Sequence, residues 1–250
     1  MTDRGRQLAY LQRMGIEAWV RRAPPAGVEA VAPDPAPDPV PTPVPVPAPG
    51  AATDTAAVAT LDWDALRERV LGCRDCELHT SRTQAVFGVG NPDADWLVVG
   101  EAPGAEEDRR GEPFVGRAGQ LLDAILRAAA QDRKTAYIAN ILKCRPPNNR
   151  DPNPDEISCC QGYLARQIAL IRPRLILAVG RIAAQHLLAT DLPIGRLRGR
   201  VHRWGEAAIP LVVTYHPAYL LRSPSEKRKV WQDLQLAMQC EREQVEVPMQ

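Results

Sequence analysis

The sequence predicts an α/β fold in which helices cover both faces of a parallel β-sheet. From about residue 61 onward, four short apolar runs alternate with longer amphipathic segments. The runs are apolar at nearly every position, which is typical of strands buried on both faces. A parallel strand returns to its neighbour through a long crossover, usually a helix, so the alternation favours parallel pairing.

The apolar runs give four expected strands: Trp96–Val99, Tyr137–Leu142, Leu175–Val179 and Leu211–Tyr215. Four helices are expected between and after them, over residues 118–129, 153–171, 181–190 and 226–239. The second helix has the clearest start. Asn153 is a suitable N-cap, a proline follows it, and Glu156 stands three residues after the cap.

Proline sets the expected domain boundaries. Eleven of the 24 prolines lie between Pro24 and Pro49. Proline fixes φ and lacks an N–H group, so this stretch predicts an extended spacer rather than a helix or an inner strand. We therefore expect a short N-terminal segment (1–22), a Pro/Ala-rich disordered linker (23–60), one folded domain (61–243) and a tail (244–250). The first segment is either a docking element or a weakly ordered tail.

Composition excludes some classes of protein and leaves others open. The formal net charge is +1, so a nucleic-acid surface would have to be a local basic patch. No apolar run approaches the ~20 residues of a membrane-spanning helix, and the first residues lack the apolar stretch of a secretory signal. We therefore expect a cytosolic protein without a membrane partner, in which six cysteines are metal ligands or free thiols rather than disulfides.

Polar residues follow three of the expected strands. Ligands of parallel α/β sheets bind beyond the carboxyl ends of the strands, which makes these positions candidates for a site. Glu101 opens an acidic turn after the first strand, Asn140 lies in the second, and His216 follows the fourth. Each also has a structural interpretation, as a surface turn, a core amide bonded to backbone, or a structural histidine. As a ligand-binding residue, Asn140 would present both a donor and an acceptor to a base edge.

Two further stretches carry candidate binding residues. Phe114 is one of only two phenylalanines and falls in a Gly/Pro loop, where it either caps the core or stacks on a ligand. Four arginines lie between Arg196 and Arg203 in a glycine-containing stretch. Such a run is either a solvated surface or a phosphate-binding segment.

The cysteines suggest a metal centre. Cys73 and Cys76 form a CxxC pair, and Cys144 and Cys160 follow far along the chain. Four thiolates from two separate chain segments can enclose a zinc ion or an iron–sulfur cluster, which spacing alone does not distinguish. Cys160 is preferred to Cys159 because it shares the inward face of its helix with apolar residues. Cys240 stays unassigned.

Together these motifs resemble the family-four, iron–sulfur uracil-DNA glycosylases. The resemblance runs from about Trp63 to Met238 and rests on motifs that read, in order, CRDC, TQAVFGVG, GEAPGAEED, GEPFVGRAGQLLD, YIANILKCRPPNNRDPNPDE and YHPAYLLR. It implies a three-layer α/β/α sandwich with a four-stranded parallel sheet. It also implies hydrolysis of the N-glycosidic bond of deoxyuridine in single- or double-stranded DNA, with uracil released and an abasic site left.

The resemblance also assigns roles to individual residues. It implies catalytic roles for Glu101, Glu107 and His216; uracil contacts by Gly100, Ala102, Phe114 and Asn140; DNA contacts by Pro103, Gly104, Arg198, Arg200, Leu221 and Arg222; and a [4Fe–4S] cluster on Cys73, Cys76, Cys144 and Cys160. Residues 1–22 lie outside the resemblance; their composition suggests that they bind a replication or repair protein, and a monomer is expected.

Three alternatives remain open at this point. A relative that traps the excised sugar covalently would use a histidine after the second strand, where residues 145–150 contain none. A non-catalytic DNA-binding module is disfavoured because Glu101, Asn140 and His216 are all present. An iron–sulfur redox protein is disfavoured because the glycine pattern at Gly88 and Gly90 precedes a strand instead of following one.

Overall fold

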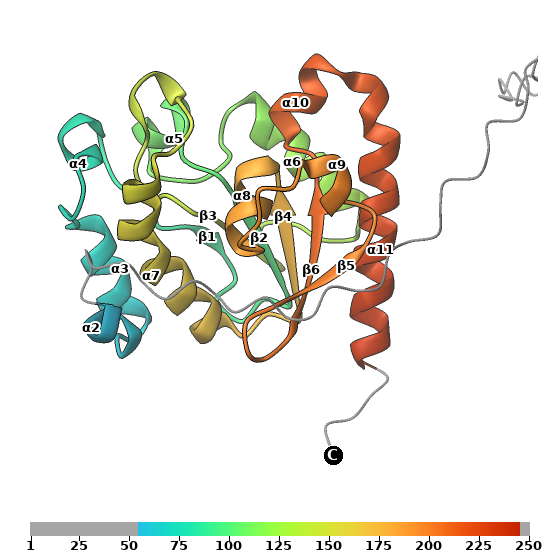
Figure 1. Cartoon of the computed structure of the whole chain (residues 1–250), viewed down its shortest axis with the longest axis horizontal. Helices are drawn as coiled ribbons and strands as arrows, with labels where there is room; N and C mark the ends of the chain where they lie inside the picture. Colours follow the sequence, from blue (N-terminus) through green and yellow to red (C-terminus); the bar gives the residue numbers. More distant parts are fainter. Residues whose placement is uncertain (1–54, 246–250) are drawn as a thin grey trace, which may run out of the picture. The chain divides into compact units, whose positions relative to one another are not determined.

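A computed structural model describes residues 55–245, and the expectations for residues 1–54 and 246–250 lie outside that range. Six strands form one sheet: β1 (Val89–Gly90), β2 (Trp96–Gly100), β3 (Ala136–Asn140), β4 (Leu175–Val179), β5 (Val201–Trp204) and β6 (Ile209–Thr214). Their order in the sheet is β1-β3-β2-β4-β6-β5 (Figure 1). The four inner strands are mutually parallel, which confirms the predicted sheet.

The two edge strands were not predicted. β1 pairs antiparallel with β3, and β5 pairs antiparallel with β6. β1 has only two residues, too few for a periodic signal. β5 contains His202 and Arg203 and is only partly buried, so it lacks the continuous apolar character of the inner strands.

Helices and 3-10 turns join the strands. They are α2 (Thr55–Ala59), α3 (Trp63–Leu71), α4 (Leu78–Ser81), α5 (Ala105–Arg110), α6 (Arg117–Ala128), η1 (Pro147–Asn149), α7 (Pro154–Ile171), α8 (Arg181–Leu187), α9 (Ile194–Leu197), α10 (Pro217–Arg222), η2 (Pro224–Glu226) and α11 (Lys227–Val245). α7 has the predicted capping box between Asn153 and Glu156. α8 ends at Leu187, short of the predicted residue 190, because Ala189 adopts a left-handed conformation with φ of 48°.

Two helical layers enclose the sheet, which gives the predicted three-layer architecture (Figure 1). α7, α8 and α9 pack on one face of the sheet, through buried residues that include Leu164, Ile168, Ala184, Leu187 and Leu197. α6, α10 and α11 pack on the other face, through Leu122, Leu126, Leu220, Val230 and Leu234 among others. No helix within residues 55–245 is both long and apolar enough to cross a lipid bilayer.

The folded region includes part of the segment expected as linker. Thr55–Ala59 form α2, and the side chain of Val58 is buried against Leu66, Val70 and Tyr163. This short segment has no clear helical period in its sequence, but burial of its apolar side chain stabilises the helix. The linker prediction for residues 23–60 is therefore wrong at its carboxyl end, while residues 23–54 lie outside the described range.

The fold brings the predicted site residues to one edge of the sheet. Gly100 at the end of β2 lies directly beside Asn140 at the end of β3 in the parallel register. Gly180, which follows β4, lies against His216, which follows β6. Parallel pairing alone produces this arrangement, because it aligns the carboxyl ends of neighbouring strands.

Candidate active site

Asn140 carries a buried amide without a partner. Its side chain is 2% exposed, and neither its amide nitrogen nor its amide oxygen finds a hydrogen-bond partner among the described residues. An unpaired buried polar group costs about 1–3 kcal/mol, so native proteins rarely leave one without a functional reason. The amide therefore suits a ligand that offers one donor and one acceptor side by side.

Gly100 allows the amide and an aromatic ring to approach each other closely. A Cβ atom on Gly100 would lie 2.4 Å from Asn140 Oδ1 and 2.6 Å from Phe114 Cζ. Only glycine fits at this position without displacing one of the two side chains. Phe114 is 6% exposed, and its ring centroid lies 5.6 Å from that of His216, with 32° between the planes. The ring thus lies near both the amide and the imidazole.

The backbone of Phe114 is strained. Its φ of 54° lies in the left-handed region, which costs a residue other than glycine about 1–3 kcal/mol. The loop also packs tightly on the start of α6, since a Cβ atom on Gly119 would lie 1.6 Å from the carbonyl oxygen of Phe114. Such a conformation persists only where surrounding contacts hold it.

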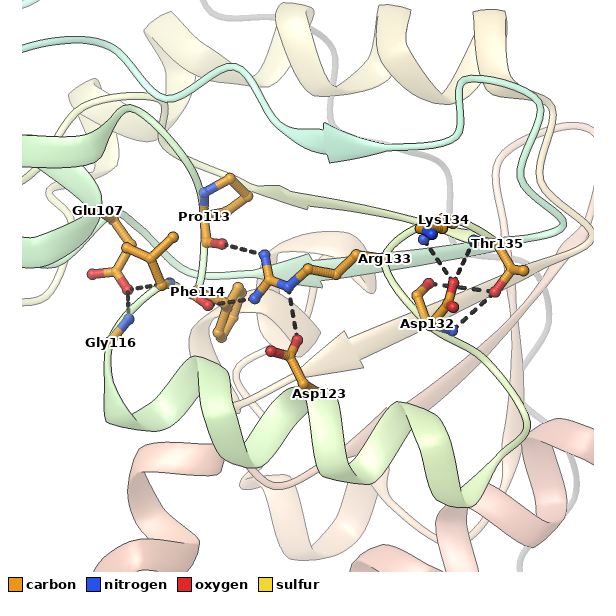
Figure 2. Close-up of polar contacts among 10 residues, drawn as sticks. Glu107, Pro113, Phe114, Gly116, Asp123, Asp132, Arg133, Lys134 and Thr135 are labelled. Carbon is orange, nitrogen blue, oxygen red and sulfur yellow. Dashed lines mark hydrogen bonds and ion pairs between the residues drawn. The ribbon is translucent and has the colours of Figure 1, made fainter.

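Glu107 supplies one of those contacts (Figure 2). Its Oε1 accepts hydrogen bonds from the backbone N–H groups of Val115 at 2.9 Å and Gly116 at 3.0 Å. The resemblance implied a catalytic role for this carboxylate. In the structure it holds the loop that carries Phe114, and the acidic turn gave no local signal for that contact.

His216 is a neutral hydrogen-bond donor. Burial, with help from the charge of Arg222, lowers its pKa to about 4, although Glu107 opposes the shift. Its Nδ1 accepts the backbone N–H of Ala218 at 3.1 Å, at the start of α10. The remaining proton of the neutral ring therefore lies on Nε2, which is free to donate to a ligand.

Glu101 is a partly desolvated carboxylate. Burial raises its pKa above the usual 4.5, and the carboxylate of Asp151 raises it further, while Arg181 lowers it. Asp151 and Arg181 form an ion pair at 2.7 Å. The residues after Glu101 form the rest of the turn: Ala102 packs towards the cysteines, Pro103 is buried, and Gly104 precedes α5 as its N-cap.

The side chains predicted to contact DNA fall into two groups. Leu221 is 41% exposed on α10 and Arg222 beside it is exposed, as is Arg200. Arg198 is instead occupied within the protein. Its guanidinium forms an ion pair with Asp233 at 2.9 Å and lies 5.3 Å from the centroid of the Tyr215 ring. Arg198 is thus held by partners within the domain.

The four predicted ligand cysteines gather on one side of the domain. Cys76, Cys144 and Cys160 belong to one cluster with Leu78 and Leu142. Arg82 donates hydrogen bonds to Cys144 Sγ and to the carbonyl oxygen of Cys73, both at 2.8 Å, which brings the fourth cysteine to the same place. Burial raises the pKa of Cys144 to about 11, and that of Cys160 is raised by burial as well.

Sulfur donors suit either a zinc ion or an iron–sulfur cluster. Within residues 55–245, no three His, Cys, Asp or Glu side chains form a group that could hold a metal ion. The adjacent Cys159 has a different contact, because its Sγ donates to the carbonyl oxygen of Asp75 at 3.3 Å.

Sequence patterns missed the residues that support the site. Asp233 is fully buried on α11 and binds Arg198 as well as the hydroxyl of Thr214, two residues before His216. A carboxylate between Val230 and Leu234, on the apolar face of a helix, is a signal that could have identified it. Asp108 accepts the backbone N–H groups of Thr83 and Gln84, and nothing in the local sequence indicates this contact.

Comparisons with known proteins identify relatives of this chain. Residues 87–235 match the model of the uracil DNA glycosylase superfamily. A type-4 uracil-DNA glycosylase of Archaeoglobus fulgidus is 46% identical over 177 residues, which cover 68% of this chain and 88% of that protein. One from Thermotoga maritima is 44% identical over 70% of this chain and 92% of that protein.

A more distant relative shows where the resemblance weakens. A type-5 uracil-DNA glycosylase of Thermus thermophilus is 34% identical over 42% of this chain and 54% of that protein. The type-4 proteins match at higher identity and over more of both chains. The chain therefore belongs to the uracil DNA glycosylase superfamily, within its type-4 group.

Proposed function

We propose that this protein excises uracil from DNA by hydrolysing the N-glycosidic bond, and that it leaves an abasic site for repair. The observation that carries the proposal is the buried, unpaired amide of Asn140 next to the Phe114 ring. A base inside a duplex cannot reach such an amide, so the target nucleotide has to be flipped out of the stack.

Uracil matches the donor and acceptor pattern of Asn140. Its O4 accepts from the amide nitrogen and its N3–H donates to the amide oxygen, whereas cytosine reverses this pattern and would leave both amide atoms unpaired. The ring of Phe114 supplies a flat apolar surface for stacking. Together the two side chains bind the base and select it.

His216 and Glu101 act on opposite charges of the same transition state. As the glycosidic bond breaks, negative charge develops on the departing uracil and positive charge on the sugar. The Nε2–H of His216 donates to uracil O2, and the carboxylate of Glu101 stabilises the sugar cation or orients the attacking water. Because both side chains are already in position before the bond breaks, they stabilise the transition state more than the ground state.

α10 supplies the groups that replace the flipped nucleotide. Tyr219 and Leu221 are its exposed apolar side chains, and Arg222 follows directly. An apolar wedge fills the gap in the base stack, while the guanidinium binds a backbone phosphate. Arg200 adds an exposed positive charge, and Arg198 is left out of this surface because Asp233 holds it.

The test is glycosylase activity of anaerobically purified protein on an oligonucleotide with a single uracil. We expect alkali-labile cleavage only at that uracil, with many turnovers per enzyme. Matched oligonucleotides with thymine or cytosine at the same position are the controls. A covalent adduct after one turnover would instead favour the trapping relative, and intact DNA binding without cleavage would favour a non-catalytic module.

The proposal also sets the pH dependence of the reaction. Glu101 acts as a carboxylate, so kcat/KM is expected to fall as the pH drops through its pKa, which lies above 4.5. His216, with a pKa of about 4, stays neutral above pH 5 and adds no second limb. An acid limb near pH 6.5 that survives in Glu101→Gln would contradict this assignment.

Two neighbouring charges provide matched controls for this pH profile. Arg181→Ala removes a positive charge that lowers the pKa of Glu101, so the acid limb is expected to move to higher pH. Asp151→Asn removes a negative charge that raises it, so the limb is expected to move to lower pH. Shifts in the same direction would argue that Glu101 does not control the limb.

We further propose that Cys73, Cys76, Cys144 and Cys160 hold a [4Fe–4S] cluster. Bound there, the cluster would crosslink the segment around α4, the loop after β3, and α7. Burial raises the pKa of Cys76, Cys144 and Cys160. Metal binding favours the thiolate form, which at Cys144 is stabilised by an N–H donor of Arg82. We propose a structural role for this cluster.

Substitution of single cysteines tests this ligand set. Cys160→Ser is expected to lose nearly all bound iron and sulfide and to have a lower Tm. Cys159→Ser should retain its iron and sulfide. Cys240→Ser, which alters a buried cysteine of α11, is the control for simple loss of a buried thiol. Iron and sulfide content per chain decides between the two adjacent cysteines. Retention of iron in Cys160→Ser would overturn the assignment.

We propose that the enzyme acts in the cytosol, and that residues 1–22 tether it to a replication or repair protein. The support for the tether is compositional, since a proline-rich spacer separates these residues from the domain. Deletion of residues 1–54 is expected to reduce partner recovery and leave uracil excision by the isolated protein unchanged. Unchanged recovery would count against the tether.

A further inference from the structure

The loop that carries Phe114 is held from a second side by Arg133 (Figure 2). Arg133 lies between α6 and β3, outside every motif of the family resemblance. Its NH1 donates to the carbonyl oxygen of Pro113 at 3.0 Å, and its NH2 donates to the carbonyl oxygen of Phe114. One guanidinium thus binds two consecutive carbonyl groups of the loop.

Asp123 fixes the orientation of that guanidinium. Its Oδ1 accepts from Arg133 Nε at 2.7 Å, and Asp123 belongs to α6. The planar guanidinium offers five N–H donors in a fixed geometry, so binding one edge to Asp123 directs the other towards the loop. Lysine, with a single flexible ammonium group, cannot reproduce this arrangement.

We propose that Arg133, oriented by Asp123, is a positioning residue that sets the Phe114 ring as a stacking surface before DNA binds. The conformation at Phe114 is unfavourable for an isolated residue, since its φ is 54°. Glu107 fixes the N–H groups that follow Phe114, and Arg133 fixes the carbonyl groups at and before it. The ring therefore stays beside Asn140 and His216 without any help from the substrate.

The functional consequence is that the loop already has its binding conformation when the base arrives. If these contacts are removed, the backbone relaxes towards ordinary φ values, and part of the binding energy of the base goes into restoring the loop. This inference rests on the proposed uracil excision and adds a residue that serves it from outside the pocket.

Arg133→Gln tests the proposal, because glutamine keeps part of the side-chain stem and loses the guanidinium. We expect kcat/KM on uracil-containing DNA to fall roughly 10- to 100-fold, as for other misplaced binding groups. The inhibition constant of free uracil should rise by a similar factor. Asp123→Asn should cause a smaller change in the same direction, and Arg133→Lys should restore little of the loss. Arg174→Gln is the matched control, since Arg174 forms an ion pair with Asp95 at 3.1 Å in another part of the domain.

Two further readouts separate positioning from general stability. In a Phe114→Ala background, Arg133→Gln should cause no additional loss, because the ring that it positions is absent. Hydrogen exchange at the amides of Val115 and Gly116 should accelerate in Arg133→Gln and stay unchanged in Arg174→Gln. Losses that multiply in the double variant, equal behaviour of the two arginine variants, or faster exchange without loss of activity would each overturn the proposal.

Failure of the proposed function would look different. In that case the wild-type protein would not excise uracil, whatever hydrogen exchange shows for the Phe114 loop. The exchange measurement does not depend on the reaction, so it still decides whether Arg133 holds the loop.

Discussion

Replacing Asn140 with leucine is expected to abolish uracil excision while leaving the domain at least as stable as the wild type. The amide makes no hydrogen bond among the described residues, so its loss removes a cost of about 1–3 kcal/mol instead of a contact. Leucine has nearly the same shape and fills the same space. In the transition state, however, the enzyme loses both contacts to the base edge, and kcat/KM should fall by roughly 10³-fold or more.

The contrast with another buried amide makes this prediction specific. Gln167 is also fully buried, but it accepts from Lys143 Nζ at 2.6 Å and donates to the carbonyl oxygen of Phe87 at 2.9 Å. Gln167→Leu would remove the hydrogen bond to the Phe87 carbonyl and one of the two hydrogen bonds of Lys143 Nζ, so it should lower the free energy of unfolding by about 1–3 kcal/mol. Denaturant unfolding of the two variants, beside their activities, checks both halves. Destabilisation of Asn140→Leu equal to that of Gln167→Leu would mean that Asn140 is an ordinary core amide.

The second large effect is expected at His216. His216→Leu should lower kcat by roughly 10²- to 10³-fold with little change in KM, because the Nε2–H bond to uracil O2 strengthens only as negative charge develops. His216→Leu also removes the acceptor for the backbone N–H of Ala218, and loss of a helix cap costs about 1 kcal/mol. Capping and catalysis therefore have to be separated.

His216→Asn achieves this separation. Asparagine is a favourable N-cap that can accept the Ala218 N–H, but it is too short to reach the base. We expect it to recover the stability lost in His216→Leu and none of the rate. Steady-state kinetics and Tm of the two variants provide the measurement. Equal rates for His216→Asn and the wild type would remove His216 from the reaction.

The sequence predicted the framework of the fold more completely than the contacts at its site. The inner strands carry continuous apolar runs, and α7 carries its own capping box, so local chemistry determines both. Asn140 and His216 could be selected because the ends of parallel strands converge. The contacts of Glu107 with Val115 and Gly116 and of Arg198 with Asp233 depend on how the chain folds back, so local sequence did not predict them. Local sequence around Arg133 gave no signal, because its role depends on contacts with Pro113 and Phe114 in a separate loop.

The edge strands affect how the domain behaves in a crowded solution. β6 (Ile209–Thr214) ends in the apolar, β-branched run LVVT, and an exposed backbone there would offer unpaired N–H and C=O groups to other chains. β5 occupies that edge, presents Arg203 to solvent, and is only four residues long, while the two residues of β1 cover the opposite edge. Short and charged edge strands discourage one sheet from extending into another. The carboxyl ends of the strands, where Asn140 and His216 lie, can therefore stay open to DNA while the two outer strands protect the sheet from aggregation. Truncation within β5 would expose β6 to pairing between copies of the chain.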